Sequence, residues 1–358
     1  MHFTTALQPI SRACRSVGWA LLLCCVAALL SACATPAAGP AAAAPVVLSA
    51  ASNEGVLARN ERWLLYLPQP QDTNALIATR FLGSSQRDWE VAEANAGAAP
   101  RPGYPTIVPL KPANPTGVKR DRVQTVPILC YHRVGNSTNR MTVSTAVFAE
   151  QLDWLESNGY RVLRLQDVAA FLDGKQALPA KSVVLTFDDG YESYYRYAYP
   201  LLKKHGFPAT VFLYTDFVGA GDALTWPQMQ EMTASGLIDI QAHSKTHANL
   251  INRIRDETEA AYRQRLEAEA KVPREQIERR LKQPVKDFAY PYGDANDAVL
   301  DVLGRNSYRL GLTVNPGGTP FYAQPLMLRR TMIYGNHDIE AFKARLQISR
   351  SLALPALP

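Results

Sequence analysis

From Val126 onward, short apolar runs alternate with helical patterns, and this alternation limits the possible folds more than any other feature of the sequence. It is typical of an α/β domain with parallel strands. The predicted strands are 127–131, 161–165, 182–187, 209–214, 237–242, 285–290, 309–314 and 328–334, and the predicted helices include 145–158, 194–205, 226–234, 253–282 and 338–346. Seven or eight such units in about 225 residues favour a distorted (β/α)7–8 barrel over an open doubly wound sheet. In both architectures, catalytic side chains lie at the carboxyl ends of the strands.

Polar side chains follow four of the predicted strands. They are His132, the pair Asp188 and Asp189, the pair His243 and His247, and the segment Pro291-Tyr292-Gly293. Two adjacent carboxylates at the end of a buried strand need a cation to offset their repulsion. Two imidazoles and one carboxylate form the protein ligand set of many catalytic zinc sites. The sequence therefore predicts a divalent metal site at one rim of the barrel.

Two of these segments carry a family resemblance. The sequences TFDDG at 186–190 and HSKTH at 243–247 resemble the first two motifs of the polysaccharide deacetylases, carbohydrate esterase family four. The resemblance covers about residues 126–346 and implies a metal-dependent de-N-acetylase on a distorted barrel.

The resemblance also implies a role for each motif residue. Asp189, His243 and His247 would bind the metal, with Zn²⁺ as the first expectation and Co²⁺ or another divalent ion as the alternative. Asp188 would be the general base that takes a proton from the attacking water.

A third segment, FAYPYG, resembles the family's third motif. There the backbone N–H of the residue after Pro291, here Tyr292, would help to bind the oxyanion. Ala289 stands where many members carry an arginine that orients the base. That role is left to another residue, with Arg329 and Arg330 as candidates.

The general acid is expected from the start of the domain. The family's usual C-terminal Leu-x-His motif is missing, and Tyr131-His132-Arg133 resembles the permuted exopolysaccharide deacetylases that act on β-1,6-linked N-acetylglucosamine. His132 is therefore the predicted acid, and His337 is the competing candidate.

The N-terminal region has the charge and hydropathy order of an export signal. Arg12 and Arg15 precede an apolar run over 17–30, and no acidic residue occurs before Glu54. The run is shorter than the roughly 20 residues that cross a bilayer, so an uncleaved anchor is the weaker alternative. The sequence LSAC, ending at Cys33, resembles a bacterial lipoprotein signal. It implies an exported protein, lipidated on Cys33 and anchored to a membrane of the cell envelope, on the periplasmic side and in the outer membrane where one exists; an ordinary secretory signal is the alternative.

The remaining sequence divides the chain into five segments. They are a signal peptide (1–32), a flexible Ala/Pro tether (33–60), a small module (61–110), a linker (111–125) and the large catalytic domain (126–350). The module has a strand, two helices and a strand, and this βααβ order resembles the lysin motif, which implies an α+β glycan-binding module. A spacer without a ligand is the alternative.

Composition narrows the partners. The formal charge is 38 − 32 = +6, and no basic run interleaved with aromatic residues occurs, so nucleic acid is not expected as a partner. The resemblances to polysaccharide deacetylases and to a lipoprotein signal together imply removal of N-acetyl groups from an N-acetylglucosamine polysaccharide of the envelope, such as peptidoglycan, poly-β-1,6-N-acetylglucosamine or a chitin-like polymer. An O-acetyl esterase and a non-catalytic glycan-binding lipoprotein are the alternatives.

Overall fold

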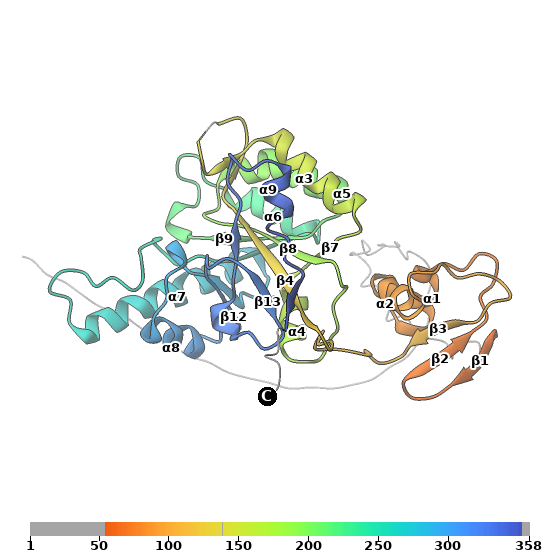
Figure 1. Cartoon of the computed structure of the whole chain (residues 1–358). Coiled ribbons are helices and arrows are strands. Elements are labelled where there is room, and N and C mark those ends of the chain that lie inside the picture. Colours follow the sequence, from red (N-terminus) through yellow and green to blue (C-terminus); the bar gives the residue numbers. More distant parts are fainter. Residues whose placement is uncertain (1–53, 138, 353–358) are drawn as a thin grey trace, which may run out of the picture. The chain divides into compact units, whose positions relative to one another are not determined.

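The computed structural model describes residues 54–137 and 139–352 (Figure 1). The expected signal peptide, Cys33 and most of the expected tether lie outside these residues. Within the described part of the chain, no helix combines the length and apolar character needed to cross a membrane.

The small module has one more strand than expected. Its elements are β1 (Val56–Arg59), β2 (Trp63–Tyr66), α1 (Asn74–Leu82), a short 3-10 turn (Ser85–Arg87), α2 (Asp88–Ala94) and β3 (Thr106–Pro109), with β2 central in an antiparallel sheet. The expected βααβ order is therefore ββααβ, and the tether ends before β1. Asn60 explains the extra strand, because its side chain accepts hydrogen bonds from the N–H groups of Arg62 and Trp63 and folds β1 back onto β2.

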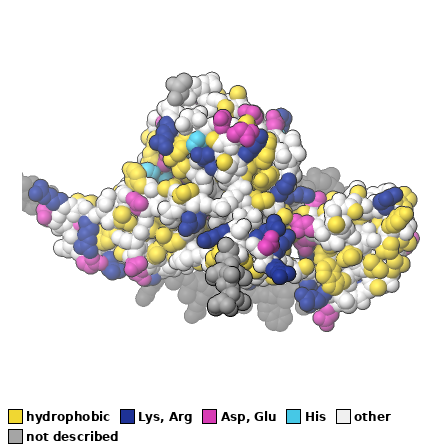
Figure 2. All heavy atoms as spheres, viewed as in Figure 1, with side chains coloured by type: hydrophobic (Ala, Val, Ile, Leu, Met, Phe, Trp, Pro, Cys, Tyr) yellow, Lys and Arg dark blue, Asp and Glu magenta, His cyan; other side chains and the backbone are white. Residues whose placement is uncertain are grey.

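One face of the module's sheet packs on its helices. The buried residues are Leu64, Tyr66, Ile77, Ala78, Val91 and Val108. Other apolar side chains of the module, such as Leu57, Trp63 and Ile107, stay exposed, and Figure 2 shows apolar areas on its surface. Clustered apolar side chains on a surface are typical of interaction sites.

The large domain is built on a curled sheet of mostly parallel strands (Figure 1). These strands are β4 (Arg122–Tyr131), β7 (Arg161–Leu163), β8 (Ser182–Phe187), β9 (Ala209–Leu213), β10 (Ile238–Ala242), β11 (Asp287–Ala289), β12 (Leu310–Leu312) and β14 (Thr331–Met332). The order is β12-β11-β10-β9-β8-β4, and β14 pairs with β4. A single bridge between Leu312 and Leu328 links β12 to the segment before β14. The sheet thus curls toward closure, and the predicted distorted barrel is confirmed.

Short antiparallel strands extend β4 at its amino-terminal half. β13 (Gly318–Pro320) and β15 (Ser349–Ser351) both pair with β4, while β5 (Arg133–Val134) and β6 (Thr142–Val143) form a separate parallel pair. The predicted linker 111–125 is therefore too long, because β4 already begins at Arg122. The Thr125 hydroxyl also donates to the carbonyl of Gln347 over 2.6 Å, which ties this segment to the C-terminal strand.

Helices follow most of the parallel strands. They are α3 (Thr145–Ser157), α4 (Leu165–Leu172), α5 (Tyr199–His205), α6 (Trp226–Ala234), α7 (Glu259–Leu281), α8 (Asp297–Arg305) and α9 (Ile339–Lys343), with a π-helical turn (Tyr194–Ala198) before α5. The predicted helix 253–282 begins later, because the Thr258 side chain caps α7. The predicted strand 161–165 ends earlier, because Leu165 begins α4, which the sequence analysis did not identify.

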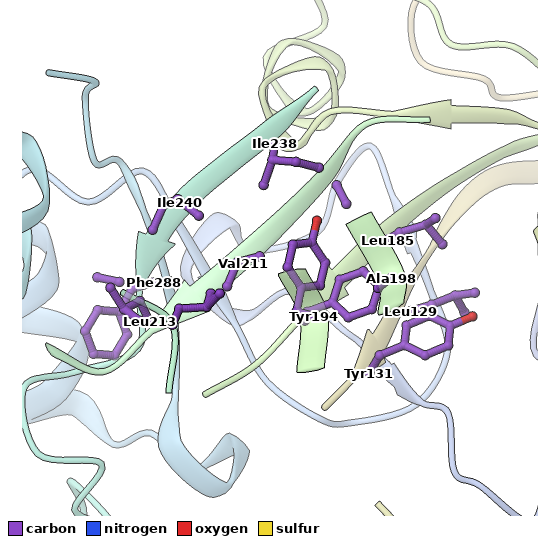
Figure 3. Packing of buried hydrophobic residues seen from close by; sticks show 14 of the residues in the cluster. Leu129, Tyr131, Leu185, Tyr194, Ala198, Val211, Leu213, Ile238, Ile240 and Phe288 are labelled. Atoms are coloured by element: carbon purple, nitrogen blue, oxygen red, sulfur yellow. The ribbon is translucent and has the colours of Figure 1, made fainter. Parts of the chain in front are cut away.

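Strand side chains alternate between two buried clusters. The outer cluster lies between the sheet and its helices and includes Leu129, Tyr131, Leu185, Val211, Leu213, Ile240 and Phe288 (Figure 3). The inner cluster includes Ile128, Val184, Phe212, Ala289 and Leu312 together with residues of α4. Because side chains alternate along a strand, every second residue of a strand points into the barrel and the residues between them point to the helices.

A buried acidic residue outside the catalytic rim gives a prediction about stability. Burial and the nearby Asp239 carboxylate raise the pKa of Asp287 to about 7, against the partial opposition of Arg309 and Lys286. The folded protein thus keeps the Asp287 carboxyl protonated up to about pH 7, whereas the unfolded chain loses this proton near pH 4. The stabilisation that the retained proton gives to the folded state is lost as the pH rises through 7. We expect Asp287→Asn to raise the free energy of unfolding at pH 8 by roughly 1–3 kcal/mol, with a smaller gain at pH 5.

Urea denaturation at both pH values measures this effect. Asp173→Asn is a suitable control, because the Asp173 side chain is more exposed and pairs with Arg309 over 2.7 Å. A variant at Asp287 that loses stability at pH 8 would show that the carboxylate is needed in its charged form.

Candidate active site

The alternation of side chains along the strands places the predicted residues at one rim of the barrel. Ile128 and Val184 belong to the inner cluster, so His132 and Asp188, four residues further along each strand direction, continue the inward-facing series. On β10 the outer-cluster residue Ile240 places His243, three residues later, on the inner side. The structure therefore assembles residues from three strands at the carboxyl end of the barrel.

Three side chains there form a compact ligand set. The ligand atoms of Asp189, His243 and His247 all lie within 4.8 Å of one another. Asp189 Oδ1 lies 3.5 Å from Nε2 of His243 and 3.2 Å from Nε2 of His247. Burial raises the pKa of Asp189, but the two imidazoles outweigh this and hold it well below its usual value.

The chemistry of this set fits a divalent cation. Asp189 Oδ1 is buried and, among the described residues, accepts no hydrogen bond. The Nδ1–H group of His243 donates to the carbonyl of Ala289 over 2.7 Å, which leaves the Nε2 lone pair directed to the site. An uncompensated buried carboxylate oxygen facing two imidazole nitrogens is an arrangement that a metal ion satisfies.

Asp188 is paired with a buried arginine. Its Oδ1 and Oδ2 accept hydrogen bonds from the two terminal nitrogens of Arg330 over 2.6 and 2.7 Å. Burial raises the pKa of Asp188, but Arg330 and His243 outweigh it, so the pKa lies below its usual value. Of the two candidate arginines, Arg330 is therefore the one that contacts Asp188, whereas Arg329 is exposed and donates to the carbonyl of Pro316.

The two candidate acids lie in different surroundings. Burial lowers the pKa of His132, against the partial opposition of the Asp188 and Asp189 carboxylates, and its Nδ1 is buried with no hydrogen-bond partner among the described residues. For His337, Nδ1 accepts from the N–H of Tyr334 and Nε2 lies 2.8 Å from Arg345. The structure thus brings His132 to the site and engages both ring nitrogens of His337 elsewhere.

Pro291 and Tyr292 also lie at the rim. Pro291 is buried, while Tyr292 is 62% exposed and its ring centroid lies 5.1 Å from that of His247. The next residue must be glycine, because a Cβ on Gly293 would lie 2.7 Å from the backbone nitrogen of Val314.

Comparison with known proteins gives the family. Residues 175–311 match the family model described as polysaccharide deacetylase. The chain is 29% identical over 230 residues to YxkH of Bacillus subtilis (strain 168), whose name groups it with polysaccharide deacetylases, covering 64% of this chain and 79% of that protein. The structure of the Streptococcus pyogenes deacetylase PplD in complex with acetate matches with a TM-score of 0.57 and 29% identity, covering 62% of this chain and 98% of that one. This chain carries a polysaccharide deacetylase domain.

The deacetylase also resembles a relative with a named substrate. It is 29% identical over 240 residues to the poly-β-1,6-N-acetyl-D-glucosamine N-deacetylase of Escherichia coli (strain K12), covering 58% of this chain. The matched region spans only 36% of that relative's length. The matched domain makes the protein a polysaccharide deacetylase, a hydrolase that removes acetyl groups.

The site of this deacetylase concentrates backbone strain. Asp189, Ser244, His247 and Tyr292 have φ values of 75°, 71°, 63° and 63°, and they are half of the eight non-glycine residues with positive φ in the described chain. Each such residue costs on the order of 1–3 kcal/mol and persists only where its surroundings hold it.

Two deacetylase residues near the site were not predicted. The Sγ atom of Cys130 lies 3.3 Å from Oδ2 of Asp188. Cys130 lies two residues before His132, so both side chains point to the same side of the strand, and this spacing could have identified Cys130 from the sequence. Glu269 lies on α7 and accepts hydrogen bonds from the loop between His243 and His247. No sequence pattern identifies Glu269, because its contact depends on how α7 packs.

Proposed function

We propose that this protein is a metal-dependent N-deacetylase that hydrolyses N-acetyl groups of an N-acetylglucosamine polysaccharide of the cell envelope and releases acetate. One observation carries the proposal: a buried oxygen of Asp189, which has no hydrogen-bond donor in the described part of the chain, faces two imidazoles beside an Asp188 carboxylate that Arg330 holds. The cofactor we propose is a divalent ion, Zn²⁺ first, held by Asp189, His243 and His247.

Each residue around the proposed metal ligands has a separate role in amide hydrolysis. When bound, a divalent cation there supplies Lewis-acid chemistry, since it polarises an acetyl carbonyl and increases the acidity of water. Asp188, oriented by Arg330, accepts the proton of the attacking water. The Tyr292 N–H stabilises the oxyanion, and His132 protonates the departing amine.

The substrate class rests on the relatives. The Escherichia coli relative is named for poly-β-1,6-N-acetyl-D-glucosamine, and this supports a β-1,6-linked polymer as the first substrate to test. Peptidoglycan and chitin-like polymers are the alternative N-acetylglucosamine polymers. We also propose that the protein is an exported lipoprotein anchored through Cys33 and that its module binds the same class of glycan; both proposals rest on the sequence.

A metal-binding assay coupled to acetate release tests the proposal. We expect the wild-type protein to bind about one Zn²⁺ or Co²⁺ and to release acetate from β-1,6-linked N-acetylglucosamine oligomers, whereas His243→Ala should bind little metal and release little acetate. Chitin oligomers, peptidoglycan and acetylated xylan, assayed in parallel, separate the linkage and the O-acetyl alternative. Full metal occupancy in His243→Ala would contradict the assigned ligand set.

A further inference from the structure

The two imidazoles of the proposed metal set are held by different means. The His243 ring is fixed directly, because its Nδ1–H group donates to Ala289 and its side chain is only 2% exposed. The His247 side chain is 25% exposed and is flanked by the rings of Tyr214 and Tyr292, with centroids 5.1 Å away in both cases. The backbone N–H of His247 is hydrogen-bonded within its own loop, and its Nε2 faces Asp189. The position of the His247 ring therefore depends on its backbone.

That backbone belongs to a strained loop. Ser244 and His247 both have left-handed φ values, of 71° and 63°. This conformation is unfavourable for residues that carry a Cβ. Within the loop, the N–H of His247 donates to the Ser244 hydroxyl over 2.9 Å. This hydrogen bond leaves the N–H groups of Lys245 and Thr246, which lie between these two residues, to find acceptors outside the loop.

Glu269, on α7, satisfies them. Its Oε2 accepts hydrogen bonds from the N–H groups of Lys245 and Thr246 over 2.9 and 3.0 Å, and its Oε1 accepts from the Thr246 hydroxyl over 2.7 Å. Glu269 is buried, with 4% of its surface exposed. Hydrogen bonds from N–H groups to a carboxylate are among the stronger ones in proteins. Both carboxylate oxygens are thus committed to the loop that carries His247.

We propose that Glu269 is a positioning residue that fixes the loop between His243 and His247 and thereby holds the His247 imidazole in place for the metal. The inference rests on the proposed function, since it requires the metal site. Glu269 acts on His247 and not on His243, because His243 has its own anchor at Ala289. This difference separates metal positioning from a general contribution to stability.

Metal affinity of Glu269→Gln, measured by chelator competition with Zn²⁺ and Co²⁺, tests the proposal. The amide keeps the size of the side chain but replaces one acceptor oxygen with a donor group. We expect about 10- to 100-fold weaker binding, together with a changed visible absorption spectrum of the Co²⁺ form. Glu267→Gln is the matched control, because Glu267 lies on the same helix but accepts from Asn306; its affinity should equal that of the wild type.

A double-mutant cycle then locates the effect. In a His247→Ala background, Glu269→Gln should weaken binding by less than about twofold, because the ligand that it positions is gone. An undiminished effect in that background would show that Glu269 acts on the whole domain and would overturn the proposal. Thr246→Val removes one of the three hydrogen bonds to Glu269 and also the acceptor of the Ala248 N–H. It covers the case in which Glu269→Gln does not fold; it should weaken binding severalfold, and wild-type affinity would count against the proposal.

The outcomes distinguish a failure of the proposed function from a failure of this inference. A wild-type protein that binds no metal would overturn the proposed function and this inference with it. A wild-type protein that binds metal while Glu269→Gln binds it equally well would overturn this inference alone.

Discussion

Replacing His132 by alanine is expected to lower kcat on an N-acetylated sugar by about 10² to 10⁴, the usual cost of losing a positioned general acid. Metal content should stay unchanged, because His132 lies beside the three proposed metal ligands but is not one of them. The same variant should lose less activity on an activated aryl acetate, whose leaving group departs without protonation. Acetate release from both substrates, measured with metal analysis, gives the comparison.

His337→Ala is the matched control for this prediction. Its ring nitrogens contact Tyr334 and Arg345, so its removal should leave kcat on both substrates near that of the wild type. If His337→Ala is instead the variant that fails selectively on the amide, the acid comes from the C-terminal part of the domain, and the similarity to the permuted deacetylases does not extend to His132.

Arg330→Met is expected to lower the free energy of unfolding by about 3–5 kcal/mol and to abolish deacetylation, because it leaves Asp188 buried without its cation. Arg330 has no exposed surface, and it also donates to the Thr313 carbonyl and to the Thr186 hydroxyl. Without the guanidinium, burial would raise the pKa of Asp188, and less of the base would be ionised. Urea denaturation and acetate release measure the two effects.

Two further variants separate charge from packing in this prediction. Arg329→Met removes the neighbouring, exposed arginine and should change stability by no more than about 0.5 kcal/mol. Adding Asp188→Asn to Arg330→Met removes the buried charge and should restore part of the stability but none of the activity. A double variant that is no more stable than Arg330→Met would mean that the guanidinium acts through packing on Phe212 rather than through the ion pair.

The sequence was sufficient to predict the residues at the rim of the barrel, but not all of the residues that hold them in position. His132, Asp188 and His243 follow apolar strands, and the ends of strands and their two-residue period are local features. The choice between Arg329 and Arg330 depends on the pairing of β14 with β4, where a shift by one residue exchanges the two side chains. Strand pairing between distant segments is not a local property, so both candidates remained open in the sequence.

The module and α7 show the same limit. Strand β1 was assigned to the tether because alanine-rich sequence precedes it, although Asn60 carries the turn that folds it onto β2. Glu269 is one of several glutamates on α7, and only the packing of that helix shows that its carboxylate contacts the loop between His243 and His247.

The single bridge between Leu312 and Leu328 has a consequence for the order in which the enzyme becomes competent during folding. The three proposed metal ligands lie within residues 189–247, whereas Arg330 lies between Leu328 and β14, next to this bridge. We expect a domain in which this seam is open to keep the three ligands but to leave Asp188 without its arginine, so that deacetylation requires a closed seam. Amide hydrogen exchange at Leu328 and acetate release, followed together during refolding, should rise in step.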